Sequence, residues 1–316
     1  MSPSKLLAGV FPSFSSWVFI AMLPLLPWSY TTEANLTLRG WHSPPSGKPV
    51  LHFLHGNGLC GLVYSPMLHA LSEHFDLWLC DIQGHGVSDA GEQFLGWNRN
   101  ADLAMAAFDA HASLWQGVAH YALGHSFGGV LTSLLLAKHP QRFRAAVLLD
   151  PVIFTPWMVR ALQLGEQLGL QHFTPLAKQA KARRRSWANR VAAADALNGR
   201  GMFREWAPEA FDAYIQHALQ HDEGGEARLR CPAEIEATIF STTPRGLWSA
   251  LRAIAVPTCL IHGESSYPFV AKSAKRLQGL NQAIVVQQVA GGHCFMQERP
   301  TEAADWVSAF LRSQSA

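Results

Sequence analysis

The sequence predicts an α/β protein in which helices flank a mostly parallel central sheet. Two observations lead to this prediction. Short apolar runs alternate along the chain with longer segments of helical spacing, as expected when strands are joined by crossover helices. The chain can also bury a large core, because it has 316 residues of which 48% are hydrophobic and 15% are charged.

The predicted elements form two blocks that an insertion separates. We expect strands at 36–41, 49–54, 75–80, 121–123, 143–149, 257–263 and 283–289, and helices at 62–74, 101–114, 130–138, 245–254 and 303–311. Between residues 156 and 242 the spacing is helical and no good strand is found. We therefore predict a core made of 31–155 and 243–316, a helical insertion at 156–242, and a separate apolar segment at 1–30.

The stretch Gly-His-Ser-Phe-Gly at 124–128 follows one apolar run and precedes another. This order predicts a strand, a tight turn and a helix, with Ser126 forced outward at the turn. Glycines on both sides allow the strand and the helix to pass close to the serine. The positive end of the helix dipole behind Ser126 suits a developing oxyanion. Ser126 is therefore the candidate nucleophile.

With this turn the sequence resembles the α/β-hydrolase superfamily, and the insertion at 156–242 takes the position of the cap in its capped members. The resemblance implies the α/β-hydrolase fold and a serine hydrolase of the esterase or lipase type. A second motif of the family follows the last strand, where Gly-Gly-His-Cys-Phe at 291–295 precedes Gln-Glu-Arg-Pro at 297–300. Since this loop lies at the carboxyl end of a strand, we predict His293 as the general base.

The oxyanion hole needs two backbone N–H groups. The resemblance implies Phe127, which follows the nucleophile, and Asn57, which follows His55-Gly56 at the end of a predicted strand. We expect the Asn57 side-chain amide to be an additional donor, and the His55 ring to support the loop. Dehalogenases and standard epoxide hydrolases of the superfamily use an aspartate nucleophile, so Ser126 argues against both activities.

The acid that orients His293 departs from the common pattern. The family's usual Gly-Glu-x-Asp reads Gly-Glu-Ser-Ser at 263–266, so Ser266 stands where the aspartate is expected. We favour Asp150, which closes the strand 143–149, as some members of the superfamily place their acid there. Glu264 and the lack of any acid remain alternatives, and Asp150 could instead cap a helix that begins near Pro151.

The insertion carries aromatic and basic residues. Its tryptophans and phenylalanines are expected to pack in a core, and any that face the cleft would favour a hydrophobic substrate (Trp157, Trp187, Phe203, Trp206, Phe211). The basic run that ends in Arg183, Arg184 and Arg185 is expected to form a solvated helix face. Its alternative role is to bind anionic lipid headgroups or an anionic group of the substrate.

Charge and cysteine usage limit the partners. The net charge of +2 gives no electrostatic reason to expect nucleic acid. The five cysteines are scattered and form no metal-binding pattern, so we predict free thiols in the cytoplasm and neither a metal nor a cofactor. Residues 6–32 lack charge but contain three prolines. We expect this segment to lie on the protein or contact a membrane surface, with a cleaved signal or an anchor as the alternative.

The sequence thus predicts a serine hydrolase that uses Ser126, His293 and Asp150 to cleave carboxylic ester or thioester bonds of a hydrophobic small molecule through an acyl-enzyme. Hydrolysis of a C–C bond would use the same residues. The other alternative is a non-catalytic protein that binds its ligand beneath the insertion, which the serine at position 266 favours.

Overall fold

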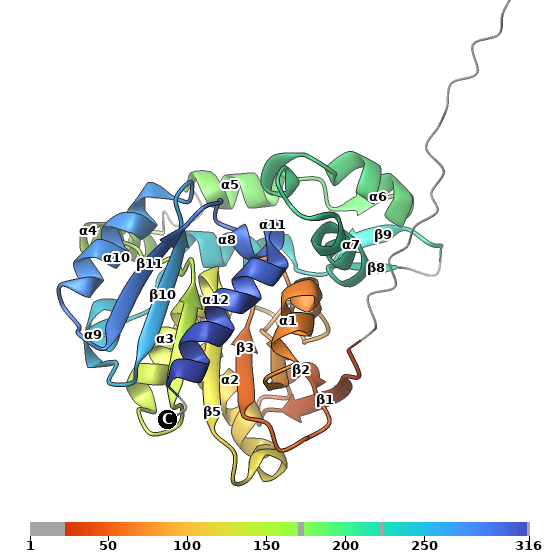
Figure 1. Cartoon of the computed structure of the whole chain (residues 1–316). Coiled ribbons are helices and arrows are strands. Elements are labelled where there is room, and N and C mark those ends of the chain that lie inside the picture. Colours follow the sequence, from red (N-terminus) through yellow and green to blue (C-terminus); the bar gives the residue numbers. More distant parts are fainter. Residues whose placement is uncertain (1–22, 170–173, 222–223, 315–316) are drawn as a thin grey trace, which may run out of the picture.

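The computed structural model describes residues 23–169, 174–221 and 224–314, and it contains a central eight-stranded sheet with helices on both faces (Figure 1). The strand order is β1-β2-β4-β3-β5-β6-β10-β11. The strands are β1 (Leu26–Thr31), β2 (Thr37–His42), β3 (Val50–Leu54), β4 (Asp76–Asp81), β5 (His120–His125), β6 (Ala145–Leu149), β10 (Thr258–Gly263) and β11 (Ile284–Val289). From β4 to β11 all neighbouring strands are parallel, whereas β1 and β2 are antiparallel additions at one edge. The predicted α/β class is confirmed.

Helices cover the two faces of this sheet because its central strands are apolar on both sides. In β3, Leu54 packs on one face while Leu51 and Phe53 pack on the other. The first face carries α2 (Trp97–Ala110), α3 (Ser126–Lys138), α9 (Leu247–Ala253) and α10 (Pro268–Gln278). The second carries η1 (Gly61–Tyr64), α1 (Ser65–Leu71), α11 (Phe295–Glu298) and α12 (Pro300–Ser313), and η2 (Ala112–Trp115) leads into β5. We did not predict α10, although parallel pairing of β10 with β11 requires such a crossover.

The strand β1 corrects the predicted boundary at residue 30. The expected apolar segment 1–30 is not wholly separate, because Leu26–Thr31 pairs with β2. Trp28 stacks on Trp78 at 4.4 Å between ring centroids, and its Nε1 donates to the Leu79 carbonyl at 3.1 Å. Trp28 is the one buried residue of this strand. Residues 1–22 lie outside the described part, and no described helix is long and apolar enough to cross a bilayer.

The insertion contributes no strand to the large sheet in its described residues, but it is not wholly helical as predicted. Its helices are α4 (Pro156–Gln167), α5 (Pro175–Ala182), α6 (Arg190–Leu197), η4 (Gly201–Phe203), α7 (Pro208–His217) and α8 (Ala233–Ser241). A small antiparallel sheet adds β7 (Ser186–Trp187), β8 (Leu219–His221) and β9 (Ala227–Leu229). Strands of two or three residues are too short to show an alternating pattern, so they could not be predicted.

Most aromatic side chains of the insertion are buried in the hydrophobic cluster that also covers one face of the central sheet. Phe203 lies 5.0 Å from Trp206 and 4.6 Å from Tyr214 between ring centroids, and all three are buried. Trp187 and Phe211 are buried in the same cluster. Trp157 is instead 69% exposed on α4. The aromatic residues thus explain how the insertion folds, and they leave the predicted hydrophobic substrate without this support.

Candidate active site

The three predicted catalytic residues meet at one edge of the sheet. Ser126 follows β5, Asp150 follows β6, and His293 lies in the loop after β11. Because these strands are parallel, their carboxyl ends open at the same edge. His293 Nε2 lies 2.9 Å from Ser126 Oγ, and His293 Nδ1 lies 2.9 Å from Asp150 Oδ1. The structure therefore brings the three residues together in a hydrogen-bonded line.

The backbone at Ser126 has the strained form that the turn requires. Its φ is +54°, in the left-handed region that non-glycine residues seldom occupy. A Cβ on Gly128 would lie 2.2 Å from the Leu54 carbonyl oxygen, and one on Gly124 would lie 2.4 Å from Thr132 Oγ1. Larger residues therefore do not fit at either glycine. The close approach of α3 to β3 also allows Gly128 N–H to donate to the His55 carbonyl at 3.1 Å.

Asp150 is fully buried and held by several donors. Its Oδ2 accepts from Gly263 N–H at 2.8 Å, and its Oδ1 accepts from Ser266 Oγ at 2.6 Å as well as from His293. Ser266 stands at the sequence position of the aspartate in the common pattern. Its hydroxyl thus binds the Asp150 carboxylate, which contacts His293. Glu264 is exposed, and none of its described contacts is with His293. Asp150 does not cap a helix either, since α4 begins only at Pro156.

The proton positions on His293 follow from its partners. An ionised carboxylate only accepts hydrogen bonds, so Nδ1 carries the proton that is donated to Asp150. In the neutral ring Nε2 is then an acceptor, and it accepts a hydrogen bond from the Ser126 hydroxyl. This is the tautomer that a general base for Ser126 needs.

The two residues expected to supply the oxyanion-hole N–H groups, Asn57 and Phe127, follow the carboxyl ends of β3 and β5. Phe127 lies in the first turn of α3, where N–H groups have no partner within the helix. In the loop after β3, the N–H of Asn57 has no acceptor among the described residues. The neighbouring N–H groups do have partners. Gly56 N–H donates to Tyr64 Oη, and Gly58 N–H donates to His85 Nε2. Leu59 N–H donates to the Gly56 carbonyl.

The side chain of Asn57 does not behave as expected. Its Nδ2 donates to the Glu236 carbonyl on α8 at 3.1 Å, so the amide joins the loop to the insertion instead of adding a third oxyanion donor. The His55 ring is buried, and its Nε2 accepts from Ile82 N–H at 3.0 Å. His55 therefore holds the loop after β3 against the loop after β4, which agrees with the supporting role expected from the sequence.

A buried chain of hydrogen bonds links the loops on either side of Ser126. Gly56 N–H donates to Tyr64 Oη at 3.0 Å, and Tyr64 O–H donates to His125 Nδ1 at 2.6 Å. His125 Nε2 in turn donates to the carbonyl of His293 at 3.0 Å. Burial lowers the pKa of His125 to about 3, which keeps the ring neutral as this chain requires. Tyr64 was not predicted from the sequence. The only indication of such a partner was His125, which directly precedes the nucleophile.

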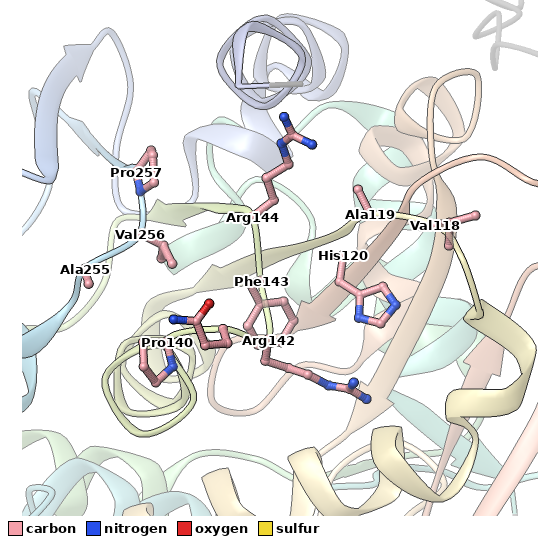
Figure 2. Close-up of a pocket in the computed structure, with 11 residues that line it drawn as sticks. Val118, Ala119, His120, Pro140, Arg142, Phe143, Arg144, Ala255, Val256 and Pro257 are labelled. Carbon is pink, nitrogen blue, oxygen red and sulfur yellow. The ribbon is translucent and has the colours of Figure 1, made fainter. Parts of the chain in front are cut away.

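A surface groove lies away from this site. It has a volume of about 670 Å³ and is lined by residues that precede β5, β6 and β10 (Figure 2). His120, Arg142 and Pro257 mark its walls. Since the groove opens at the amino ends of the strands, it is at the opposite edge of the sheet from Ser126. No group of three metal-binding side chains is found among the described residues.

Solved structures share this fold. The crystal structure of E-2-(acetamidomethylene)succinate hydrolase aligns with a TM-score of 0.69 at 23% identity, and covers 91% of this chain and 99% of that one. A peroxisomal α/β-hydrolase of Saccharomyces cerevisiae aligns with a TM-score of 0.73 at 18% identity, over 92% and 88% of the two chains. A thioesterase domain from the curacin biosynthetic pathway aligns with a TM-score of 0.66 at 19% identity, over 90% and 98%.

Sequence comparison identifies relatives with named activities. A 2-(acetamidomethylene)succinate hydrolase of Mesorhizobium japonicum is 27% identical over 262 residues, which cover 79% of this chain and 83% of that protein. A pimeloyl-[acyl-carrier protein] methyl ester esterase of Proteus mirabilis is 32% identical over 107 residues, 34% of this chain and 38% of that protein. The sequence profile described as "Alpha/beta hydrolase family" matches residues 53–306, from β3 to α12. This match spans most of the chain, and the protein therefore belongs to the α/β hydrolase family.

Proposed function

We propose that the protein is a serine hydrolase that cleaves carboxylic ester or thioester bonds through an acyl-enzyme. The observation that carries this proposal is the hydrogen-bonded line from Ser126 through His293 to Asp150, with both distances at 2.9 Å. A serine hydroxyl is a weak nucleophile until a base accepts its proton. In this arrangement the base is oriented by a buried carboxylate and lies within reach of the hydroxyl.

In the proposed reaction Ser126 Oγ attacks the carbonyl carbon while His293 Nε2 accepts the hydroxyl proton. The N–H groups of Asn57 and Phe127 stabilise the negative oxygen of the tetrahedral intermediate. The intermediate then collapses, the bond to the leaving group breaks, and His293 returns its proton to the departing alcohol or thiol. Water activated by His293 attacks the acyl-enzyme in the same way and restores Ser126.

The named relatives support hydrolysis of more than one kind of bond. The Proteus mirabilis esterase and the curacin thioesterase domain favour an ester or a thioester. The similarity to the Mesorhizobium japonicum hydrolase over 79% of this chain favours a second candidate, hydrolysis of a bond other than an ester in a dicarboxylate substrate. Both candidates use Ser126 as the nucleophile, so a test of Ser126 comes first.

A fluorophosphonate probe tests the proposal because it reacts with activated serine hydroxyls. We expect the wild-type protein and Ser249→Ala, a control at an exposed serine on α9, to be labelled. Ser126→Ala should not be labelled, and peptide mass spectrometry should place the adduct on Ser126. An unlabelled wild-type protein, beside a serine hydrolase labelled in the same tube, would favour the non-catalytic binding protein and contradict the proposal.

A further inference from the structure

The basic run of the insertion is not the solvated helix face that the sequence predicted. The helix α5 ends at Ala182, so the three arginines lie in the extended segment that leads to β7. Only Arg184 is exposed, and its guanidinium lies 5.6 Å from the centroid of the Trp187 ring. Arg183 and Arg185 turn to the other side and are about three-quarters buried, with side-chain exposures of 28% and 26%.

These two arginines converge on a single buried carboxylate. Arg183 Nη2 lies 2.7 Å and Arg185 Nη1 lies 3.6 Å from Glu236 Oε2, whose side chain is only 5% exposed. Two guanidinium groups facing one carboxylate leave an excess of one positive charge. A further anion beside this partly exposed pair would balance the excess charge.

The cluster also has donors that are not used. Arg185 Nη2 donates to the Cys231 carbonyl. Arg183 Nε is buried and has no hydrogen-bond partner among the described residues. Buried polar groups in folded proteins nearly always have partners, so this guanidinium N–H keeps hydrogen-bonding capacity for an acceptor such as water or a ligand.

The cluster lies beside the proposed oxyanion hole. A Cβ on Gly58 would lie 3.1 Å from Glu236 Oε1 and 3.6 Å from Arg183 Nη2. Gly58 directly follows Asn57, whose N–H is the proposed oxyanion donor, and the Asn57 amide binds the backbone of Glu236. The Arg183 guanidinium is therefore close to Gly58, the residue that follows the proposed oxyanion donor in the chain.

We propose that Arg183 and Arg185 form a subsite for a carboxylate of the substrate, a few carbon atoms away from the scissile carbonyl. The substrates would then be half-esters or half-thioesters of short dicarboxylic acids. This proposal deepens the proposed function and rests on it for the position of the scissile bond. Guanidinium groups suit the task because their planar N–H pairs match the two oxygens of a carboxylate, and Glu236 holds them in place before the substrate arrives.

Two ethyl esters of equal size test the subsite. Monoethyl succinate carries a carboxylate where ethyl succinamate carries a neutral amide, so their ratio of kcat/KM reports recognition of the charge. We expect the wild-type protein to prefer the carboxylate by about tenfold to a hundredfold, the effect of a hydrogen bond to a charged group. Arg183→Gln should reduce the ratio to about one. Arg184→Gln, which removes the same charge from the same run, should keep the wild-type ratio.

A second variant and a binding measurement separate the possible failures. Arg183→Gln leaves Glu236 buried without one partner, so the double variant Arg183→Gln/Glu236→Gln removes both charges and should also lose the preference. Calorimetry of succinate with Ser126→Ala measures the subsite without turnover, and adding Arg183→Gln should weaken binding about tenfold or more. Any of three results would overturn the carboxylate subsite. They are equal kcat/KM for the two esters in wild type, equal succinate binding with and without Arg183, and tighter binding of inorganic phosphate than of succinate. A wild-type protein that fluorophosphonate does not label, while Arg183-dependent succinate binding is retained, would overturn only the serine hydrolase.

Discussion

The core loops and the insertion meet at the same edge of the sheet, but they are built on different principles. Ser126 is fixed by a strand, a tight turn and a helix whose glycines leave no space for a side chain. Arg183 is held instead by buried charge, in an extended segment between short elements. If the proposed function and subsite hold, the difference teaches that the core would supply a reacting geometry that many substrates can share, while the insertion would select among those substrates. Variants at the catalytic residues of the core should therefore lower the turnover of every ester, whereas variants of the insertion should change the ratio between esters.

Replacement of the base should have the largest effect. His293→Ala leaves Ser126 without a proton acceptor, and we expect kcat for every ester to fall by about 10⁴-fold or more. Steady-state hydrolysis of a charged and a neutral ester measures this loss. A uniform fall in kcat with an unchanged ratio between the two esters would support the separation of roles. A loss confined to the charged ester would contradict it.

Backbone packing at the turn should be the next most sensitive feature. Gly128→Ala places a methyl group against the Leu54 carbonyl, and we expect the free energy of unfolding to fall by about 2–3 kcal/mol. Gly165 in α4 has no atom within 4 Å of its Cβ position. Gly165→Ala in the insertion should instead raise the free energy of unfolding by about 0.5–1 kcal/mol. Urea denaturation compares the two, and equal effects would show that the turn is not the more constrained region.

The buried histidines of the core should make stability depend on pH. Burial lowers the pKa of His52 and His125 to about 3 and that of His85 to about 4 in the folded chain. Below pH 6.5 the unfolded chain binds protons that these rings do not, so the free energy of unfolding falls as the pH drops from about 6.5 toward 4. Each histidine contributes about 1.4 kcal/mol per pH unit in this window.

Acids whose pKa is raised by burial oppose this trend, and Asp81 shows the largest shift among them. Burial raises the pKa of Asp81 to about 6, so its contribution to stability is present at low pH and is lost as the pH rises from about 4 to 6. Six described histidines have a lowered pKa and four carboxyl groups have a raised one, so urea midpoints should fall between pH 7 and pH 5. His52→Leu removes one of these histidines and should make the dependence shallower. Midpoints that rise as the pH is lowered would contradict this account.

Tyr64 should act as a positioning residue that links the loops around Ser126. Tyr64→Phe removes the hydroxyl between Gly56 N–H and His125, and we expect kcat to fall about tenfold with KM nearly unchanged, the loss of about one charged or network hydrogen bond. Tyr214→Phe, at a buried tyrosine of the insertion, is the matched control and should leave kcat as it is. A shift in KM alone for Tyr64→Phe, or equal losses in both variants, would argue for a merely structural hydroxyl.

Ser266 should have the smallest effect in this series. Its hydroxyl is one of several donors to Asp150, so Ser266→Ala leaves the carboxylate bound to His293 and to Gly263 N–H. We expect kcat to fall only about threefold to tenfold, the value of one neutral hydrogen bond. The same variant should keep the ester ratio set by the insertion. A loss as large as that of His293→Ala would mean that Ser266 has a catalytic role of its own.

The sequence predicted most of the core because its signals are local. The turn around Ser126 and the loop of His293 each follow an apolar strand, and parallel strands bring such loops to one edge. The position of β1 and the helix α10 were missed, since pairing with a neighbour and the need for a crossover are not visible in one segment. The serine at position 266 left Asp150, Glu264 or no acid as the possibilities, and only the fold shows that Asp150 lies beside the base.

The insertion was less predictable for the same reason. The strands β7, β8 and β9 are too short to leave a pattern, and the aromatic side chains have the same spacing whether they form a core or line a cleft. Arg183 and Arg185 resembled a solvated run because their partner, Glu236, lies more than fifty residues away in the sequence. Ion pairs between distant segments depend on tertiary packing, which no local pattern records.

The central claim is that Asp150, at the end of β6, orients the base that activates Ser126. It is tested most directly by the second-order rate of fluorophosphonate modification of Ser126 in Asp150→Asn and Glu264→Gln. We predict a fall of at least about a hundredfold for Asp150→Asn, since the corresponding change in a known triad costs up to ~10⁴. Glu264→Gln should react at the wild-type rate. A near-normal rate in Asp150→Asn together with a large loss in Glu264→Gln would contradict the account.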